Sequence, residues 1–373
     1  MKTGILGGGQ LARMLMEECY KFGFEFHILS KEKDSPAGQL TKYEVTGDWN
    51  DEICLEKFAD NCDIITLENE FIDYKKLKCI EKTGKEIFPS SSIIKLIQDK
   101  YFQKNTLVKS GIPVADFREI NSKNDIRQFI SEKEFPVVLK SRTMGYDGKG
   151  NFTINNEEDI GKAFDSLSRV GKLMCEKFIS FETEIATQVV RSKSGEVRVY
   201  PLVETIQKNH ICNMVIASEK KFGNITKKVR KIAEKIVTDL EYIGVMGIEM
   251  FLTGNDIVIN ELAPRVHNSG HYTIEGCRTS QFENHMRAIM DYPTGDTEMT
   301  CKNAVMINIL GERNGDALLR GEKEFLKKEN VYLHIYGKNQ TRIGRKMGHI
   351  TVLNDNLDDA ISIAAECREI INI

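Results

Sequence analysis

The sequence lacks the features that mark several large classes of protein. Its nine cysteines include no C-x-x-C pair, so neither a zinc site nor a disulfide framework is indicated. Reduced, mostly buried thiols in a cytoplasmic protein are expected instead. No hydrophobic run approaches the ~20 residues of a membrane-spanning helix, and no signal peptide precedes the first predicted strand. We therefore expect neither a membrane protein nor a secreted one.

An excess of one charge is also missing. The formal net charge is −3, and there is no basic tail and no run of five like charges, so nucleic acid is not an expected partner. Internal repeats and low-complexity segments are absent as well. With 41% hydrophobic and 29% charged residues, the 373-residue chain is typical of a globular protein of two or three domains.

The first 97 residues alternate predicted strands with predicted helices. Strands are expected at 3–6, 26–29 and 64–68, with helices from about 10 to 22 and from about 73 to 83. Such a βαβ series predicts a parallel sheet. Glu68 ends one strand, at the edge where open α/β sheets bind ligands, although it could equally be a surface acid.

A glycine-rich turn follows the first strand. Residues 7–12 match G-x-G-x-x-A, a weak dinucleotide signal. The acid that would bind a ribose is missing from the second strand, where Ser30 and Lys31 stand instead, so NAD is disfavoured. The alternative is that backbone amides around Gly8, Gly9 and Gln10 hold a substrate phosphate at a helix N-terminus.

A second glycine-rich segment lies between two predicted strands. The strand at 136–140 ends in Lys140, the next strand spans 152–154, and residues 145–150 between them contain three glycines. A flexible flap of this kind can close its amides over phosphates. No G-K-[ST] opens a helix here, so it is not a Walker loop, and an ordinary long hairpin is the alternative.

Two carboxylates fall in a predicted hairpin. Runs 247–252 and 256–261 flank Thr253-Gly254-Asn255. With a two-residue loop Glu249 would face Asn260, whereas an odd-numbered loop or a bulge at 253–256 would place it opposite Glu261. Opposed carboxylates repel, so the second arrangement predicts a cation between them, and Mg²⁺ is favoured. Placement on different or solvated faces is the alternative.

The segment that follows is unusually polar. Residues 260–285 contain two Arg, three His and three Asn but no Lys. Arg, His and Asn without Lys are typical of groups that hold planar anions through forked hydrogen bonds. A polar surface loop is the alternative.

The character of the chain changes after residue 291. Strands at 304–310, 331–336 and 349–353 and a closing helix at 357–371 predict a small α+β unit. Its loop at 338–346 carries Lys338, Arg342, Arg345 and Lys346. A solvated face and an anion site that meets the glycine turn of the first domain are both open.

Together these segments resemble the ATP-grasp ligases, and among them the 5-(carboxyamino)imidazole ribonucleotide synthases of purine biosynthesis. The similarity covers nearly the whole chain and is carried by ILGGGQLARM, SRTMGYDGKGN, NELAPRVHNSGHYTIEGCRTSQFENH and YGKNQTRIGRKMGHIT. It implies an α/β and α+β protein with an ATP-grasp fold and, often, a homodimer. The implied domains are an N-terminal Rossmann-like parallel-sheet domain (1–97), an ATP-grasp domain (98–290) and a small C-terminal α+β domain (291–373).

The resemblance also implies roles for individual residues. ATP would be bound by Lys100, Lys140, Gly145, Tyr146, Asp147, Gly148, Lys149, Gly150, Asn151, Glu176, Lys177, Phe178, Ile179, Glu184, Asn260 and Glu261. Mg²⁺ would be held by Glu249 and Glu261. The pocket of the ribonucleotide and the carboxylating group would be formed by Gly8, Gly9, Gln10, Glu68, Tyr146, Asn268, Ser269, His271, Lys338 and Arg345. As catalytic residues, Arg265 and His267 would hold bicarbonate or carboxyphosphate, and Asp147 would hold or deprotonate the amine.

The implied reaction joins bicarbonate to the amine of 5-aminoimidazole ribonucleotide at the cost of ATP, through carboxyphosphate. A second possibility is an ATP-grasp ligase that activates formate, such as a glycinamide ribonucleotide transformylase. A third is a nucleotide-sensing binding protein, against which the paired carboxylates and the lysines speak. One departure from the family is Gln207, which aligns where relatives have a histidine, with His210 three residues later.

Overall fold

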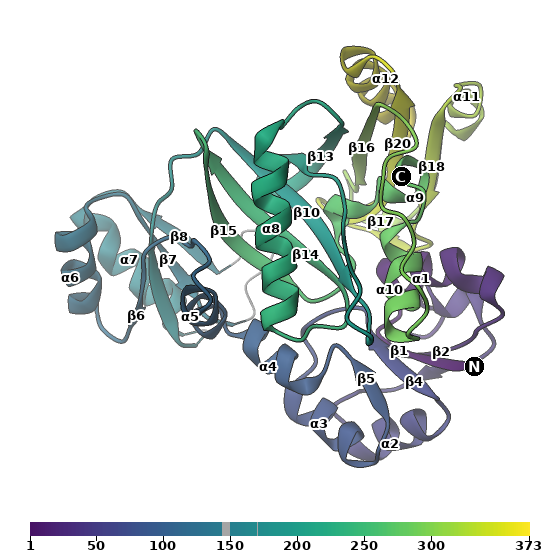
Figure 1. Ribbon diagram of the computed structural model, residues 1–373, viewed down its shortest axis with the longest axis horizontal. Coiled ribbons are helices and arrows are strands. Elements are labelled where there is room, and N and C mark those ends of the chain that lie inside the picture. Colours follow the sequence, from purple (N-terminus) through teal and green to yellow (C-terminus); the bar gives the residue numbers. More distant parts are fainter. Residues whose placement is uncertain (144–149, 170) are drawn as a thin grey trace.

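The computed structural model describes residues 1–143, 150–169 and 171–373. Figure 1 shows the N-terminal segment in purple and blue, a teal unit on the opposite side, and the yellow C-terminal segment continuing the central sheet. Within the described residues, every helix falls short of the length and apolarity that crossing a membrane requires.

The first 98 residues form a parallel sheet with helices around it, which confirms the predicted βαβ series. The elements are β1 (Lys2–Leu6), α1 (Gln10–Cys19), η1 (Tyr20–Phe22), β2 (Glu25–Ser30), η2 (Gly38–Leu40), β3 (Glu44–Thr46), α2 (Glu52–Asp60), β4 (Ile64–Leu67), α3 (Tyr74–Lys82), β5 (Glu86–Phe88) and α4 (Ser91–Gln98). The strand order is β3-β2-β1-β4-β5, with parallel neighbours throughout. The order reverses between β1 and β4, and crevices at such points bind ligands.

A smaller antiparallel sheet follows and carries the second glycine-rich segment. Its elements are α5 (Lys100–Lys109), β6 (Phe117–Ile120), α6 (Lys123–Lys133), β7 (Val137–Ser141), β8 (Asn151–Ile154), α7 (Glu157–Leu167) and β9 (Leu173–Lys177). The strand order is β6-β9-β7-β8. Ile126 and Phe129 of α6 and Ile160 of α7 are buried against Val137 and Leu139 of β7. This apolar layer fixes β7, and with it Lys140.

The largest sheet begins in the central segment. Its first elements are β10 (Thr183–Arg191), β11 (Val197–Val199), β12 (Val203–Lys208), β13 (Ile211–Ser218), α8 (Asn224–Asp239), β14 (Gly244–Thr253), β15 (Asp256–Ala263), η3 (Asn268–Gly270), α9 (Thr273–Gly276) and α10 (Gln281–Ile289). The amphipathic helix α8 covers one face, with Val229, Ala233, Ile236 and Val237 buried.

The same sheet continues past residue 291. The remaining elements are β16 (Asn303–Leu310), β17 (Gly315–Asp316), α11 (Glu322–Phe325), β18 (Val331–Ile335), β19 (Gln340–Thr341), β20 (Lys346–Asn354) and α12 (Leu357–Ile370). The strand order is β15-β14-β10-β12-β13-β16-β20-β18, and β13 pairs with β16 from Met214↔Ile307 to Ser218↔Asn303. The C-terminal strands therefore extend the central sheet, and the division into domains at residue 290 stays a prediction.

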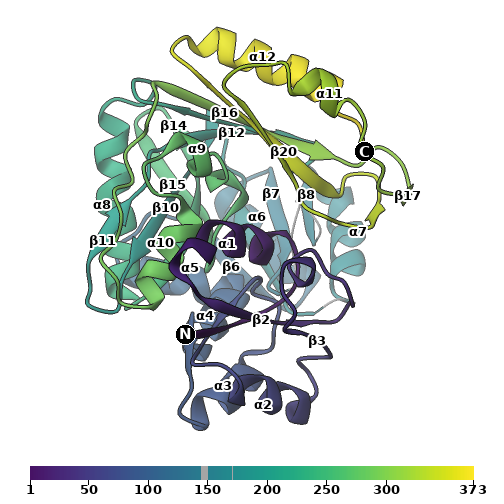
Figure 2. The ribbon, with the colours of Figure 1, turned by 90° about the vertical axis from the view of Figure 1, so that its right-hand side faces the viewer.

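The N-terminal sheet is fixed to the rest of the molecule by helix packing. In Figure 2, α1 lies against α10, and Met16 and Cys19 share an apolar core with Phe282 and Met286. Thr66 of β4 also forms a 2.8 Å hydrogen bond with His285. The ligand edge of the parallel sheet is thereby held close to the polar segment 260–285.

Candidate functional site

Glu249 and Glu261 lie directly opposite each other on β14 and β15. Partners in such a register share a face of the sheet, so the predicted same-face arrangement is confirmed. A bulge was one of the two predicted causes, but its predicted position at 253–256 was wrong, because the hairpin has a two-residue loop there, with Thr253 paired to Asp256. The register shifts further on: Met250 pairs with Ile259, so Asn260 is the extra residue of a bulge.

The environment of Glu249 disfavours its charge. Burial, followed by the charges of Glu261 and Glu184, raises the pKa of Glu249 to about 7. Lys100 Nζ lies 2.9 Å from Glu261 Oε2, and His267 Nε2 lies 3.4 Å from Glu249 Oε1. A carboxylate pair with one lysine on its rim is short of positive charge, so a cation would stabilise its ionised form.

A buried carboxylate holds two further lysines next to this pair. Lys104 Nζ is 3.3 Å from Glu176 Oε1, and Lys140 Nζ is 2.8 Å from Oε2. Burial alone would raise the pKa of Glu176, but the two ammonium groups outweigh burial and lower it to about 2. Lys104 was missed from the sequence, although it stands four residues after Lys100 and so shares its face of α5.

A small, largely apolar pocket of about 80 Å³ lies beside these lysines, between the two antiparallel sheets. Residues 176–179, predicted as the adenine edge, all line it. The rings of Phe181 and Phe251 stack at its side, 4.6 Å apart. The ammonium of Lys177 donates to the Lys133 carbonyl. Apolar walls beside cationic phosphate ligands fit a nucleotide base and its phosphates.

Glu184 is the second residue of β10, the strand that leads away from this pocket. It lies two residues before Ala186, which pairs with Glu249, so the two glutamates share a face of the sheet. Gln207 Nε2 donates to Glu184 Oε2 at 3.0 Å. The departure from the family at position 207 is therefore a glutamine that hydrogen-bonds the predicted ribose acid.

The second glycine-rich segment joins β7 to β8. Its ends are paired: Ser141 N donates to Gly150 O at 2.8 Å, and Lys140 lies opposite Asn151. Gly150 and Asn151 are therefore next to Lys140, as an ATP site in this place requires. Five predicted residues lie outside the described ones: Gly145, Tyr146, Asp147, Gly148 and Lys149.

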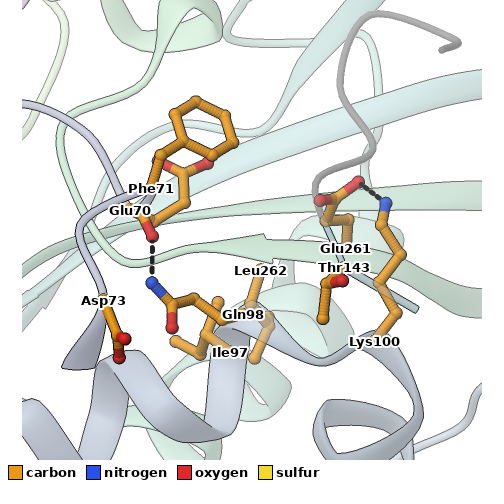
Figure 3. A pocket seen from close by; sticks show the side chains of 9 residues that line it. All are labelled: Glu70, Phe71, Asp73, Ile97, Gln98, Lys100, Thr143, Glu261 and Leu262. Atoms are coloured by element: carbon orange, nitrogen blue, oxygen red, sulfur yellow. Dashed lines mark hydrogen bonds and ion pairs between the residues drawn. The ribbon is translucent and has the colours of Figure 1, made fainter. Parts of the chain in front are cut away.

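A larger pocket of about 270 Å³ opens between the N-terminal domain and the two sheets that follow it in the chain (Figure 3). Lys100, Thr143 and Glu261 line one side of it, and residues 70, 71 and 73 line the other. Gln98 closes its floor and donates to the carbonyl of Glu70 at 2.6 Å. The carboxylate of Glu261, on β15, thus faces an opening toward the N-terminal domain.

Arg265 reaches across the same boundary. Its guanidinium forms a bidentate pair with the Glu70 carboxylate, with Nη2 to Oε1 at 3.0 Å, and both side chains are mostly buried. Glu68 and Glu70 are both partly buried, so the reading of Glu68 as a surface acid was wrong. Glu70 was not among the predicted site residues, and its place two positions after Glu68 was the available signal.

His267 presents a defined face to Glu249. Its Nδ1 lies 2.8 Å from Ser269 Oγ and also accepts from Ser269 N at 3.3 Å. Because Nδ1 accepts from the Ser269 amide, it carries no proton, and the Ser269 hydroxyl, which accepts from Gln188, donates to it. Burial, followed by the charge of Arg265, holds the pKa of His267 well below its usual range. The ring is therefore neutral and carries its proton on Nε2, toward Glu249.

Asn268, Ser269 and His271 lie behind this histidine and are almost fully buried. Asn268 exchanges two amide hydrogen bonds with Asn308, at 2.8 and 3.0 Å. His271 Nδ1 accepts from Gln281, which also donates to the His267 carbonyl. These contacts shape the loop that carries Arg265 and His267.

The glycine turn after β1 packs tightly against Glu68. Gly9 N donates to Glu68 Oε2 at 2.7 Å, and a Cβ at Gly9 would approach Glu68 Oε1 to 2.0 Å. Gly8 and Gly9 lead into α1, which begins at Gln10 and whose N-cap Gly9 makes no side-chain capping bond. Glu68 thus takes up part of the positive end of α1, so an anion at this end needs further cations.

Lys338 lies close enough to that end of α1 for the charge of Glu68 to act on it, and Arg345 lies close enough to Lys338 for its charge to act on Lys338. The loop 337–346 docks on the N-terminal domain through Gln39, which donates to the Gly337 carbonyl at 2.8 Å. Burial and the charge of Arg345, against that of Glu68, lower the pKa of Lys338 to about 8. Both cations are partly buried, which disfavours the reading of the loop as a solvated face.

The comparisons with known proteins agree with this architecture. The chain matches the ribonucleotide synthetase preATP-grasp domain over residues 1–98, the ATP-grasp domain over 105–282, and the phosphoribosylaminoimidazole carboxylase C-terminal domain over 304–362. Fold and site together define an ATP-grasp enzyme, an ATP-dependent ligase.

Individual relatives narrow the class. The N5-carboxyaminoimidazole ribonucleotide synthase of Synechococcus elongatus is 38% identical over 94% of this chain and 89% of its own length. The phosphoribosylaminoimidazole carboxylase of Ogataea methanolica is 41% identical over 96% of this chain, which spans 67% of that protein. The chain belongs to the N5-carboxyaminoimidazole ribonucleotide synthase family.

Solved structures lead to the same family. The N5-carboxyaminoimidazole ribonucleotide synthetase of Thermotoga maritima superposes with a TM-score of 0.90 at 40% identity, covering 100% of this chain and 98% of that one. The Aspergillus clavatus synthase, solved with ADP and 5-aminoimidazole ribonucleotide, gives 0.89 at 35% identity, covering 99% of this chain and 98% of that one. These similarities confirm the predicted ATP-grasp fold.

Proposed function

We propose that this protein uses ATP to carboxylate 5-aminoimidazole ribonucleotide with bicarbonate, giving ADP, phosphate and N5-carboxyaminoimidazole ribonucleotide. The observation that carries the proposal is the arrangement of three subsites around Glu261 and Arg265. On one side lies an apolar pocket with lysines, on the other a helix N-terminus with two cations, and a neutral histidine lies between them. A ligase that uses ATP to activate one substrate and joins it to a ribonucleotide needs three sites: one for ATP, one for the activated group and one for the ribonucleotide.

ATP occupies the pocket between the two antiparallel sheets. Its adenine lies along residues 176–179 beside Phe181, and Glu184, held by Gln207, takes the ribose hydroxyls. Lys100, Lys104 and Lys140 neutralise the phosphates, with Gly150 and Asn151 at the foot of the glycine-rich segment. In water-excluded sites such preorganised charges supply most of the acceleration of phosphoryl transfer.

The donor set fits Mg²⁺. Glu249 and Glu261 offer hard oxygen ligands, and the raised pKa of Glu249 indicates a site that lacks positive charge. Among the described residues no group of three or more His, Cys, Asp or Glu side chains is placed to hold a metal, so ATP phosphates would complete the coordination. Asn260, the bulged residue, adjoins the pair. Bound Mg²⁺ would withdraw charge from the transferred phosphoryl group.

Bicarbonate lies between the ATP phosphates and the ribonucleotide. Arg265, oriented by Glu70, binds its carboxylate, and the Nε2–H of His267 donates to it. Bicarbonate oxygen attacks the γ-phosphorus, the bond to the β-phosphate oxygen breaks, and ADP and carboxyphosphate form. The amine of the ribonucleotide then attacks the carboxyphosphate carbon, phosphate leaves, and the amine loses a proton. Asp147 is the proposed acceptor of that proton.

The ribonucleotide binds at the switch point of the parallel sheet. Its phosphate meets the amides at Gly8 to Gln10 together with Lys338 and Arg345. Glu68 occupies part of the helix N-terminus and orients the turn. With the phosphate at this end, the amine points toward Arg265 and His267.

The setting of the enzyme is part of the proposal. All nine cysteines carry free thiols, which supports a cytoplasmic location. A homodimer is proposed from the family resemblance alone. Size-exclusion chromatography with light scattering tests it.

A coupled assay of ADP release, with each substrate omitted in turn, tests the proposed function. ADP release should require ATP, bicarbonate and the aminoimidazole ribonucleotide together. Equal release with formate in place of bicarbonate, or with glycinamide ribonucleotide as acceptor, would assign the chain to a different ATP-grasp ligase.

A further inference from the structure

Three neighbouring histidines, two of them buried and one partly buried, connect the C-terminal sheet to segment 260–285, which carries Arg265 and His267. His334 and His349 pair across β18 and β20, and their rings stack 4.4 Å apart at an interplanar angle of 8°. His349 in turn lies 5.1 Å from His271, between ring centroids. Neither His334 nor His349 has a part in the chemistry proposed above.

Only one of the three rings lies among carboxylates. His334 Nε2 is 2.6 Å from Glu275 Oε1 of α9, and Glu17 and Glu18 of α1 face it from a second element. Burial by itself would lower the pKa of His334, but the hydrogen bond and the charge of Glu275 outweigh burial and raise it. Of the three rings, His334 is therefore the one whose surroundings favour a proton.

The neighbouring rings stay neutral. Burial, followed by the charge of His334, lowers the pKa of His349 well below its usual range, and burial, followed by the charge of His267, does the same to the pKa of His271. The Nδ1 atom of His349 bonds the Tyr336 hydroxyl at 3.0 Å, and its Nε2 is buried without a hydrogen-bond partner among the described residues. A proton on His349 would thus lack stabilisation, and the charge of the stack stays on His334.

The stacked pair forms the stem of the loop that carries Lys338 and Arg345. His334 lies four residues before Lys338, and His349 lies four residues after Arg345. Close to the stem, Gly337 O accepts from Gln39 of η2, and the Gln39 side chain in turn accepts from Arg13 of α1. A fixed stem therefore determines where the two cations stand relative to the N-terminus of α1.

Glu275, the partner of His334, belongs to the polar segment 260–285, which also carries Arg265 and His267. Glu275 lies on α9, four residues after His271, whose ring accepts from Gln281. The side-chain amide of Gln281 also holds the backbone of His267: its Oε1 accepts from His267 N, and its Nε2 donates to the His267 carbonyl. His334 is thus connected to the loop 337–346 along the chain and, through Glu275, to the segment that carries Arg265 and His267, and α1 faces it with Glu17 and Glu18.

We propose that His334 is a positioning residue, which through its ion pair with Glu275 sets the cation loop 337–346 against α1 and so determines the affinity for the ribonucleotide phosphate. The role rests on the proposed function, because it concerns the same phosphate site. His334 itself touches no substrate, since it lies in the stem of the loop. Loss of the ion pair lets the stem move, and Lys338 and Arg345 lose their placement.

Steady-state kinetics of His334→Gln, Glu275→Gln and the double variant test this role. Glutamine at 334 can still donate a hydrogen bond but carries no charge. Each single variant should raise the KM for the ribonucleotide roughly tenfold, equivalent to about 1.4 kcal/mol, with the KM for ATP and kcat within about twofold. The KM of the double variant for the ribonucleotide should not exceed the higher of the two single-variant values, because both changes remove the same interaction.

The pH profile separates positioning from a purely structural role. As the pH rises above the usual histidine range, His334 loses its proton and the ribonucleotide KM of the unaltered enzyme should rise. Lys338, with a pKa of about 8, contributes to the same rise. In His334→Gln, the ribonucleotide KM should rise with pH only by the part that is due to Lys338. Measurements from pH 7 to 9 keep the substrate phosphate, with a pKa of about 6, fully charged.

Glu366→Gln is the matched control. It removes an ion pair of the C-terminal unit, with Lys328, that lies away from α1 and α9. It should leave both KM values unchanged. An unchanged ribonucleotide KM in His334→Gln, an equal rise in the KM for ATP, or identical pH profiles would overturn the role of His334. No ribonucleotide-dependent turnover of the unaltered enzyme would instead overturn the proposed function and this role with it.

Discussion

Replacing Glu249 by glutamine should stabilise the ligand-free protein while abolishing its activity. In the folded protein the pKa of Glu249 is raised to about 7, from a usual value of 4.5, by burial and then by the charges of Glu261 and Glu184. Between these two pH values the native carboxyl keeps a proton that the unfolded chain releases. Stability therefore falls as the pH rises from about 4.5 to about 7, and the loss is complete above 7.

The size of the effect follows from the two pKa values. A difference of about 2.5 corresponds to about 3.4 kcal/mol, at ~1.36 kcal/mol for each pH unit. The Glu249 side chain is 34% exposed, so solvent screens part of this cost, and about 2 kcal/mol is expected. Glu249→Gln removes the charge and should leave the Lys100–Glu261 pair intact.

Urea unfolding at several pH values between 5 and 8, without ATP or Mg²⁺, measures the effect. The free energy of unfolding of Glu249→Gln should exceed that of the unaltered protein by an amount that grows up to pH 7 and is then constant. Turnover should fall by a factor of ~100 or more, because a ligand of the charge-stabilising site is lost. Glu234→Gln, an exposed change on α8, serves as control. A difference independent of pH, or retained turnover, would refute the reasoning.

Three further variants address the remaining subsites. Arg345→Ala should raise the KM for the ribonucleotide roughly tenfold and leave the KM for ATP unchanged. Equal rises in both KM values would favour the alternative that Arg345 belongs to a solvated face. Lys104→Met removes one of the two cations on Glu176, so the KM for ATP should rise roughly tenfold in initial-rate measurements, and an unchanged value would exclude Lys104 from the phosphate site. Gln207→Ala should raise the KM for ATP a few-fold by releasing Glu184, with a smaller effect for 2′-deoxy-ATP, and equal effects on both nucleotides would contradict the ribose assignment.

Structural features that leave a periodic or local pattern in the sequence could be predicted from it. The strand–helix alternation of the first 98 residues gives the parallel sheet, and the apolar runs after residue 300 give the C-terminal strands. The pairing of Glu249 with Glu261 was also predictable as one of two registers. The bulge at Asn260 that selects this register was not, because a bulge depends on contacts beyond the hairpin.

Contacts between distant parts of the chain could not be predicted. Glu70 and Arg265 are separated by 195 residues, and nothing local marks them as a pair. The continuation of the central sheet into β16 depends on pairing across the expected domain boundary. Lys104 was within reach, since its spacing from Lys100 places both on one face of α5, but spacing alone does not reveal the buried partner Glu176.

The central claim is that one site couples ATP cleavage to carboxylation of the ribonucleotide. The most direct test uses ¹⁸O-labelled bicarbonate with ATP and 5-aminoimidazole ribonucleotide, and follows the label by mass spectrometry. If bicarbonate oxygen attacks the γ-phosphorus, one labelled oxygen per turnover must appear in the released phosphate, and two in the carboxylated product. Phosphate without label would contradict the account, because ATP would then be hydrolysed by water rather than used to activate bicarbonate.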